Sequence, residues 1–174
     1  YWVSYPEMVR LAEGKSVVVR TSFDNDFKLT PEQLEAAITD KTKVLILCSP
    51  SNPTGSCYSK EDMEGLAEVL RKHPQVLVLS DEIYEYIVFD EEHVSLINVA
   101  PDLKDRVMLI NGFSKGFAMT GWRLGYLAAT NEIVGAVSKI QSQETSAPST
   151  ISQKAGEVAY NGDLSEVHAM RDEF

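Results

Sequence analysis

The hydrophobic pattern of the chain is dominated by four short apolar runs, at positions 44–48, 76–79, 107–110 and 124–129. Runs of this length are typical of strands, and the continuous run at 44–48 predicts a strand that is covered on both faces. The shorter run at 17–19 predicts a further strand. Elsewhere, apolar residues recur at helical spacing in segments that begin near Pro6, Thr30, Ser59, Asn131 and Thr150. The pattern predicts a three-layer α/β/α fold with a mostly parallel sheet.

Two of the expected helices carry clear start signals. Thr30 can cap one helix, with Pro31 at its first position and Gln33 three residues after the cap. Ser59 stands in the same place before another apolar stripe. These residue types at these positions satisfy backbone N–H groups that have no partner inside the helix.

The composition narrows the classes of partner. With 174 residues and a net charge of −10, the chain is an acidic protein of one-domain size. The charge argues against nucleic acid or an anionic membrane surface as a partner. No apolar run approaches the roughly 20 residues that span a bilayer, and no secretion signal is visible. A cytoplasmic location is therefore expected, and the two cysteines, Cys48 and Cys57, form no metal-ligand pattern.

Polar segments follow three of the predicted strands. They carry Asn52, then Asp81 and Tyr84, and then Lys115. Because the carboxyl ends of parallel strands share one edge of a sheet, these side chains are expected to converge there, where α/β proteins bind ligands. Taken alone, each has an ordinary alternative: a turn residue, a helix cap, a core tyrosine and a surface lysine.

Together, these side chains match the needs of one coenzyme. A lysine amine condenses with an aldehyde, and an aspartate keeps a facing pyridine nitrogen protonated, which makes the ring an electron sink. Tyrosine and asparagine can hydrogen-bond a phenolate oxygen, and the fork of Arg123 matches a phosphate. These are the needs of pyridoxal 5′-phosphate (PLP).

The ordered motifs resemble those of the class I/II aminotransferases of fold type I, in the aspartate aminotransferase-like branch. The resemblance rests on the segments at 1–8, 51–55, 80–84 and 114–126. It implies that Lys115 binds the coenzyme aldehyde, that Asp81 binds the pyridinium nitrogen, and that Tyr84 and Asn52 bind the 3′-oxygen. It further implies that Ser114 and Arg123 bind the phosphate and that Trp2 stacks on the coenzyme ring. A cis peptide bond at Asn52–Pro53 is also predicted, since it would aim Asn52 at the ring.

The resemblance further implies transamination between an amino acid and a 2-oxo acid, by a homodimer. Aspartate is the first expectation for the substrate, with aromatic amino acids close behind. Positions 1–160 would form part of the PLP-binding large domain, and 161–174 would start the helix that leads to a small domain. The abrupt aromatic start and the missing helix cap near Phe174 predict a segment truncated at both ends. The resemblance implies that parts of the site then lie outside the segment, which would be inactive alone and would expose apolar surface.

Two other functions share these residues. One is a PLP-dependent lyase or synthase of the same fold, in which Lys115, Asp81 and Arg123 would keep their roles. The other is the aminotransferase-like sensor domain of a transcription regulator, which also keeps the lysine. The run from Met119 to Arg123 favours the transaminase.

Overall fold

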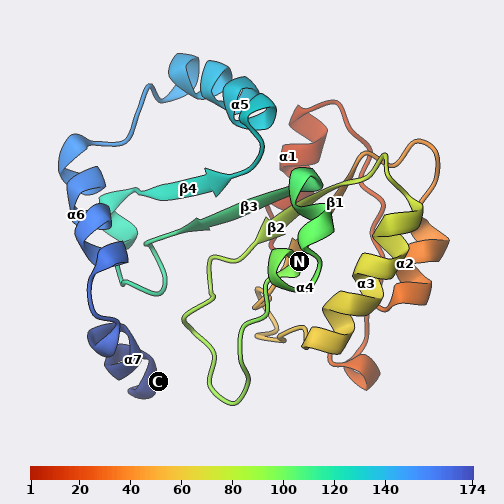
Figure 1. The fold of residues 1–174 in the computed structure, drawn as a ribbon, viewed down its shortest axis with the longest axis horizontal. Helices are drawn as coiled ribbons and strands as arrows, with labels where there is room; N and C mark the ends of the chain where they lie inside the picture. The colour runs from red at the N-terminus through yellow and green to blue at the C-terminus, as the bar shows by residue number, and fades with distance from the viewer.

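The computed structural model describes residues 1–174, and a four-stranded sheet lies at its centre (Figure 1). The strands lie in chain order: β1 (Val44–Cys48), β2 (Leu77–Asp81), β3 (Val107–Gly112) and β4 (Gly125–Ala128). The first three run parallel, and β4 runs antiparallel to β3. The mostly parallel sheet is therefore confirmed, although β2 and β3 each continue two residues beyond their apolar runs.

The register of the sheet decides where Asp81 lies. At the carboxyl end of β2, Asp81 is opposite Cys48 of β1 on one side and Ile110 of β3 on the other. Asp81 is therefore the last residue of a central strand, held by neighbours on both sides.

Helices on one face of the sheet begin where the sequence predicts. Helix α2 (Pro31–Ala37) is capped by Thr30, and α3 (Lys60–Lys72) by Ser59. Each has a complete capping box, formed with Gln33 and with Asp62. The remaining short helices are α1 (Tyr5–Leu11), α4 (Leu96–Val99) and the 3-10 turns η1 (Phe23–Asn25), η2 (Pro101–Arg106) and η3 (Thr120–Trp122).

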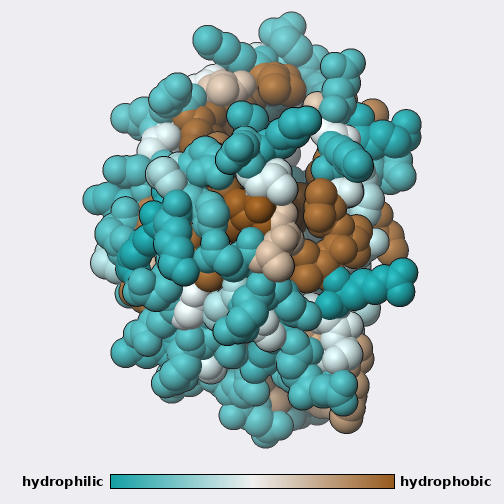
Figure 2. Space-filling model, turned by 90° about the vertical axis from the view of Figure 1, so that its right-hand side faces the viewer, coloured by the Kyte–Doolittle hydropathy of each residue, from teal (hydrophilic) through white to brown (hydrophobic).

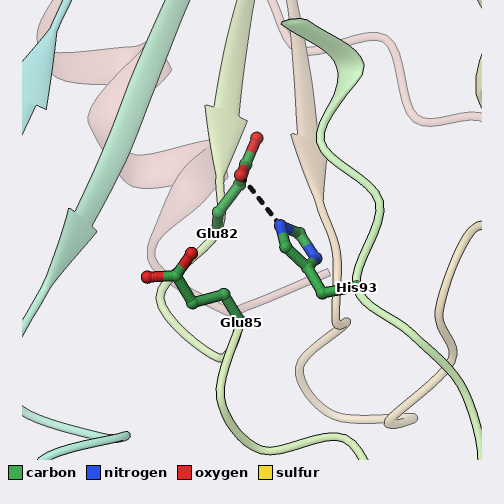
Figure 3. A group of neighbouring side chains, drawn as sticks. All are labelled: Glu82, Glu85 and His93. Atoms are coloured by element: carbon green, nitrogen blue, oxygen red, sulfur yellow. Dashed lines mark hydrogen bonds and ion pairs between the residues drawn. The ribbon is translucent and has the colours of Figure 1, made fainter. Parts of the chain in front are cut away.

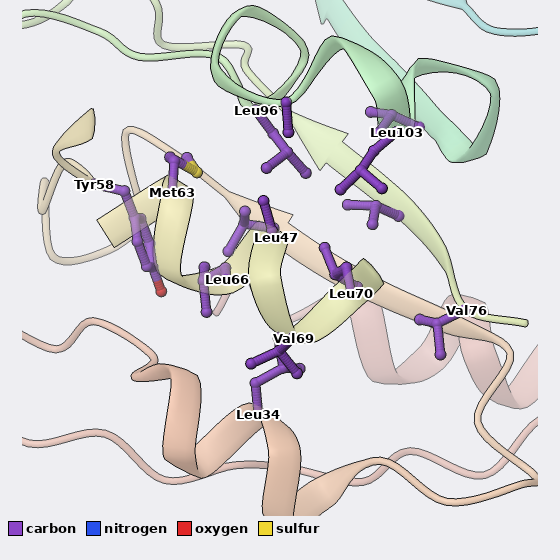
Figure 4. Close-up of a cluster of buried hydrophobic side chains, with 14 residues drawn as sticks. Leu34, Leu47, Tyr58, Met63, Leu66, Val69, Leu70, Val76, Leu96 and Leu103 are labelled. Carbon is purple, nitrogen blue, oxygen red and sulfur yellow. The ribbon is translucent and has the colours of Figure 1, made fainter. Parts of the chain in front are cut away.

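The hydrophobic core lies between the sheet and helices α2, α3 and α4 (Figure 4). Helix α3 supplies five of its fourteen buried side chains, on one helical stripe. They are Met63, Leu66, Ala67, Val69 and Leu70. Residues of β1, β2 and β3 face them, and Leu34, Leu96 and Leu103 close the edges. This packing fixes the strands whose ends carry the candidate site.

The opposite face of the sheet is far less covered. Helix α1 crosses it behind the strands in Figure 1, but Val44 of β1 is 43% exposed and Ile46 is only half-buried. The prediction that β1 is covered on both faces is therefore wrong for this chain. The predicted strand at 17–19 is also not formed, because no neighbouring strand supplies hydrogen bonds, and Val17 and Val18 are exposed.

Three helices follow β4: α5 (Asn131–Glu144), α6 (Thr150–Asn161) and α7 (Ser165–Asp172). The apolar stripe of α5 has no buried member, and Ile140 is 63% exposed. Hydrophobic side chains also reach the surface beside α2 and α3 (Figure 2). The expected exposed apolar surface is confirmed. No helix of the chain is long and apolar enough to cross a membrane.

Arg106 stabilises the carboxyl end of α3. Its guanidinium donates hydrogen bonds to the backbone carbonyls of Leu70, His73 and Val76, at 2.9 to 3.0 Å. Replacing Arg106 with methionine, which keeps the apolar stem, is expected to lower the free energy of unfolding by about 2–3 kcal/mol, because the carbonyls of buried Leu70 and Val76 and of half-buried His73 lose a charged donor. Denaturant unfolding measures the change.

Arg71 provides the control for this prediction. It lies near the same end of α3 but forms exposed ion pairs with Glu68 and Asp102. Arg71→Met should cost at most about 1 kcal/mol. Equal losses in the two variants would contradict the role assigned to Arg106.

Candidate functional site

Three of the expected side chains meet beyond the carboxyl ends of β1, β2 and β3. The Asn52 amide Nδ2 donates a hydrogen bond to the Tyr84 hydroxyl at 3.2 Å. The Nζ of Lys115 lies 5.7 Å from the centre of the Tyr84 ring, over its face. The strand-edge rule thus brings together residues that are up to 63 positions apart, from Asn52 to Lys115.

The loop after β1 holds Asn52 through its own backbone. Ser51 donates its N–H to the carbonyl of Ser56 at 3.0 Å and accepts from the N–H of Gly55 at 2.8 Å. The Asn52–Pro53 peptide bond is cis, as predicted. A groove of about 510 Å³ opens beside this loop, and Asn52, Tyr84 and Cys57 are among its lining residues. Lys115 and Asp81 lie outside that lining.

Asp81 is held by a residue that sequence reasoning missed. The hydroxyl of Tyr5, at the start of α1, donates to Oδ2 of Asp81 at 2.6 Å, while the backbone N–H of Ile83 donates to Oδ1 at 3.3 Å. The Tyr5 ring also packs edge-on against Trp2, with ring centres 5.7 Å apart. The predicted stacking residue and the predicted pyridine ligand are therefore joined through Tyr5.

Glu82, next to Asp81, points toward His93 in the segment that follows (Figure 3). It is only 3% exposed, and its Oε1 accepts from the hydroxyls of Ser80 and Ser95, each at 2.8 Å. Its Oε2 pairs with Nε2 of His93 at 2.9 Å. Burial raises the pKa of the nearby Glu85 carboxyl. This network closes the connection between Glu82 and Ser95 and so helps to position Tyr84.

The loop that carries Lys115 is braced by aromatic rings. Phe117 packs against Tyr86 and Phe113, with ring centres 5.3 and 5.5 Å apart. The N–H of Met119 donates to the carbonyl of Phe113 at 3.2 Å, which closes the loop. Lys115 itself is exposed. The amine of Lys115 is therefore not shielded from water in this chain.

Gly116 leaves no room for a side chain. A methyl group at its Cα would lie 2.7 Å from Cδ2 and 3.0 Å from Cβ of Tyr86. Gly116→Ala is expected to push the Lys115 loop outward and to cost about 1–3 kcal/mol of folding stability, as overpacking does. Thermal unfolding measures that loss.

Gly121 is the matched control for Gly116, because it lies in the same loop with nothing within 4 Å of an added methyl group. Gly121→Ala should change stability by less than about 0.5 kcal/mol. A Gly116→Ala protein as stable as the Gly121→Ala protein would show that the contact with Tyr86 does not constrain the loop.

Ser114 and Arg123 are not joined to the other candidate residues. The guanidinium of Arg123 is exposed, donates to the backbone carbonyl of Thr120 at 2.9 Å, and has no carboxylate partner. Arg123 has a left-handed backbone, with φ of 52°. Ser114 is half-buried and makes no side-chain hydrogen bond. Both lie in the loop that begins at β3, and their phosphate-binding roles remain predictions.

Helix α6 packs on the same loop. A methyl group on Gly156 would clash with Cδ2 of Leu124 and lie 3.1 Å from the ring of Phe113. The Tyr160 ring also contacts Phe113, and its hydroxyl lies 3.0 Å from that of Tyr126. The chain therefore packs α6 closely against the segment that presents Lys115.

Comparison with known proteins places these features in a family. The sequence pattern of aminotransferase class I and II matches residues 1–174. An aspartate/prephenate aminotransferase of Nitrosomonas europaea is 47% identical over 175 residues, which cover 100% of this chain and 44% of that protein. A bifunctional aspartate aminotransferase and glutamate/aspartate-prephenate aminotransferase of Petunia hybrida is 53% identical over 160 residues, covering 91% of this chain and 33% of that protein.

Solved structures agree in fold. The aspartate aminotransferase from Rhizobium meliloti superposes with a TM-score of 0.97 at 45% identity, covering 99% of this chain and 44% of that one. The aromatic aminotransferase from Pyrococcus horikoshii gives a TM-score of 0.94 at 39% identity, covering 99% of this chain and 46% of that one. The chain thus spans less than half the length of these relatives. The chain therefore belongs to the class I and II aminotransferase family.

Proposed function

We propose that this chain is the coenzyme-binding part of a PLP-dependent aminotransferase that exchanges the amino group of an aspartate-like amino acid with a 2-oxo acid. The observation that carries the proposal is the meeting of Asn52, Tyr84 and Lys115 at the sheet edge, with Asp81 ending the central strand beside them. The relatives include aspartate/prephenate aminotransferases, which supports an aspartate-like amino acid as the substrate.

The donors present fit the groups of PLP. The coenzyme, when bound, supplies an aldehyde and an electron-withdrawing pyridine ring. Asp81 offers a carboxylate to the ring nitrogen, and its two oxygens are already oriented by Tyr5 and Ile83. Asn52 and Tyr84 offer an amide and a hydroxyl to a phenolate oxygen, and Arg123 has a guanidinium free of carboxylates for a phosphate. Ser114 and Trp2 complete the proposed set.

Lys115 has two tasks in this proposal. Its Nζ would hold the coenzyme through the aldehyde, and as a free amine it would act on the proton of the substrate α-carbon as general base and then acid. The rings that brace its loop keep the amine over the ring of Tyr84. When the coenzyme is bound, the carboxylate of Asp81 would stabilise positive charge on its ring nitrogen.

The proposal extends to the organisation of the protein. Positions 1–160 belong to the large domain, and 161–174 lead toward a small domain that carries the group for the substrate carboxylate. The active protein is a homodimer in the cytoplasm, without nucleic-acid or membrane partners. The net charge of −10 and the exposed apolar stripe of α5 support these expectations.

An assay of the protein expressed from its complete gene tests the proposal. With PLP, aspartate and 2-oxoglutarate, it should form oxaloacetate and glutamate in equal amounts. A PLP-dependent lyase would instead release elimination products from the amino acid without using the oxo acid. Formation of neither pair of products with aspartate or with aromatic amino acids would contradict the proposed reaction.

A further inference from the structure

Tyr5 is the side chain that connects the two ends of the proposed coenzyme site. It is 8% exposed, and its hydroxyl lies 2.6 Å from Oδ2 of Asp81, across 76 positions of sequence. Its ring meets Trp2 edge-on at 5.7 Å. A buried tyrosine whose hydroxyl needs a partner has many possible acceptors, and here the acceptor is the carboxylate proposed to face the pyridine nitrogen.

The direction of this hydrogen bond is fixed by chemistry. Burial and the adjacent Asp81 carboxylate raise the pKa of the Tyr5 hydroxyl far above its usual value, so the hydroxyl keeps its proton at every working pH. Tyr5 is therefore always the donor, and Oδ2 of Asp81 is the acceptor.

The hydrogen bond also restricts the orientation of the carboxylate. With Tyr5 on Oδ2 and the N–H of Ile83 on Oδ1, both oxygens are held in place before any ligand arrives. Interactions that are oriented in advance cost no reorganisation when charge develops.

We propose that Tyr5 is a positioning residue for the coenzyme: its hydroxyl holds the Asp81 carboxylate in place, while its ring supports Trp2. This inference rests on the proposed function, because it assigns Tyr5 a role in the same site. It predicts that loss of one oxygen atom, in Tyr5→Phe, weakens coenzyme binding and lowers kcat more than it changes KM.

The protein expressed from its complete gene is used for the test. The dissociation constant of PLP is measured by equilibrium dialysis for wild type, Tyr5→Phe, Asp81→Asn and the double variant. Tyr5→Phe should raise that constant about 10- to 100-fold, the factor expected for a hydrogen bond to a charged group. In the Asp81→Asn background, Tyr5→Phe should change the PLP dissociation constant by less than about threefold, because the carboxylate that accepts the Tyr5 hydrogen bond is absent.

Tyr58 supplies the matched control. It is 6% exposed, and its hydroxyl also makes one hydrogen bond, accepting from the N–H of Leu29 at 2.7 Å. Tyr58→Phe should lower the thermal midpoint of the coenzyme-free protein and leave the PLP dissociation constant within about twofold of wild type.

Two results would overturn the inference about Tyr5. One is an unchanged dissociation constant in Tyr5→Phe, and the other is an equal loss of affinity with aspartate or asparagine at position 81. Either would mark Tyr5 as a structural tyrosine only. Failure of the proposed function is distinct: wild type itself would then bind no PLP, or would bind it equally well after Lys115→Ala without any covalent adduct.

Discussion

Lys115→Ala is expected to lower kcat/KM for aspartate and 2-oxoglutarate by at least about 10⁴-fold in the protein expressed from its complete gene. The substitution removes both the amine that binds the aldehyde and the group that moves the α-proton. Position 115 is exposed and its loop is held by Phe113 and Phe117, so alanine should leave folding almost unchanged. Steady-state kinetics with saturating PLP, together with a thermal melt of the coenzyme-free protein, make the measurement.

Lys154 gives a matched control, since it is an exposed lysine on α6 that pairs only with Glu157. Lys154→Ala should keep kcat/KM within about twofold of wild type. If Lys115→Ala retained more than about a hundredth of the wild-type activity, another base would have to move the proton, and the role of Lys115 would be wrong.

Asp81→Asn is expected to lower kcat by about 10²- to 10³-fold, while the affinity for the amino acid changes far less. Asparagine has nearly the same shape and can still accept from Tyr5, but it carries no charge to balance a protonated ring nitrogen. Because the substitution removes stabilisation of charge that develops during the reaction, it should lower kcat more than it changes KM. Single-turnover kinetics separate the proton-transfer step from product release.

Asp102 is the control for this second prediction. It is an aspartate whose charge serves an exposed pair with Arg71, at 2.7 Å, at the far end of α3. Asp102→Asn should cost at most about 1 kcal/mol of stability and leave kcat unchanged. Equal effects on kcat in the two variants would show that the charge of Asp81 has no special part in the reaction.

Local signals predict much of this fold. Thr30 and Ser59 cap helices as their sequences indicate, and the four apolar runs all become strands. The two errors, the strand at 17–19 and the full coverage of β1, both concern what lies beside a segment. An apolar run states that a segment can be buried, but only tertiary neighbours decide whether it is.

The candidate site also contains some residues that could be predicted and others that could not. Asn52, Tyr84 and Lys115 could be predicted to converge, because a rule of sheet topology brings strand ends together. Tyr5 and the Glu82 network could not. The acceptor of the Tyr5 hydroxyl lies 76 positions away in the sequence. Glu82 has no sequence feature that sets it apart from other acidic residues, and only the fold brings Ser95 and His93 into contact with it.

The measurement that tests the central claim most directly is borohydride reduction of the PLP-loaded protein expressed from its complete gene, followed by peptide mass mapping. Reduction fixes the bond between the coenzyme and the amine that holds it. The predicted result is one pyridoxyl group per chain, on Nζ of Lys115, with none found in Lys115→Ala. A pyridoxyl group on another lysine, or the same amount of adduct in Lys115→Ala, would contradict the account.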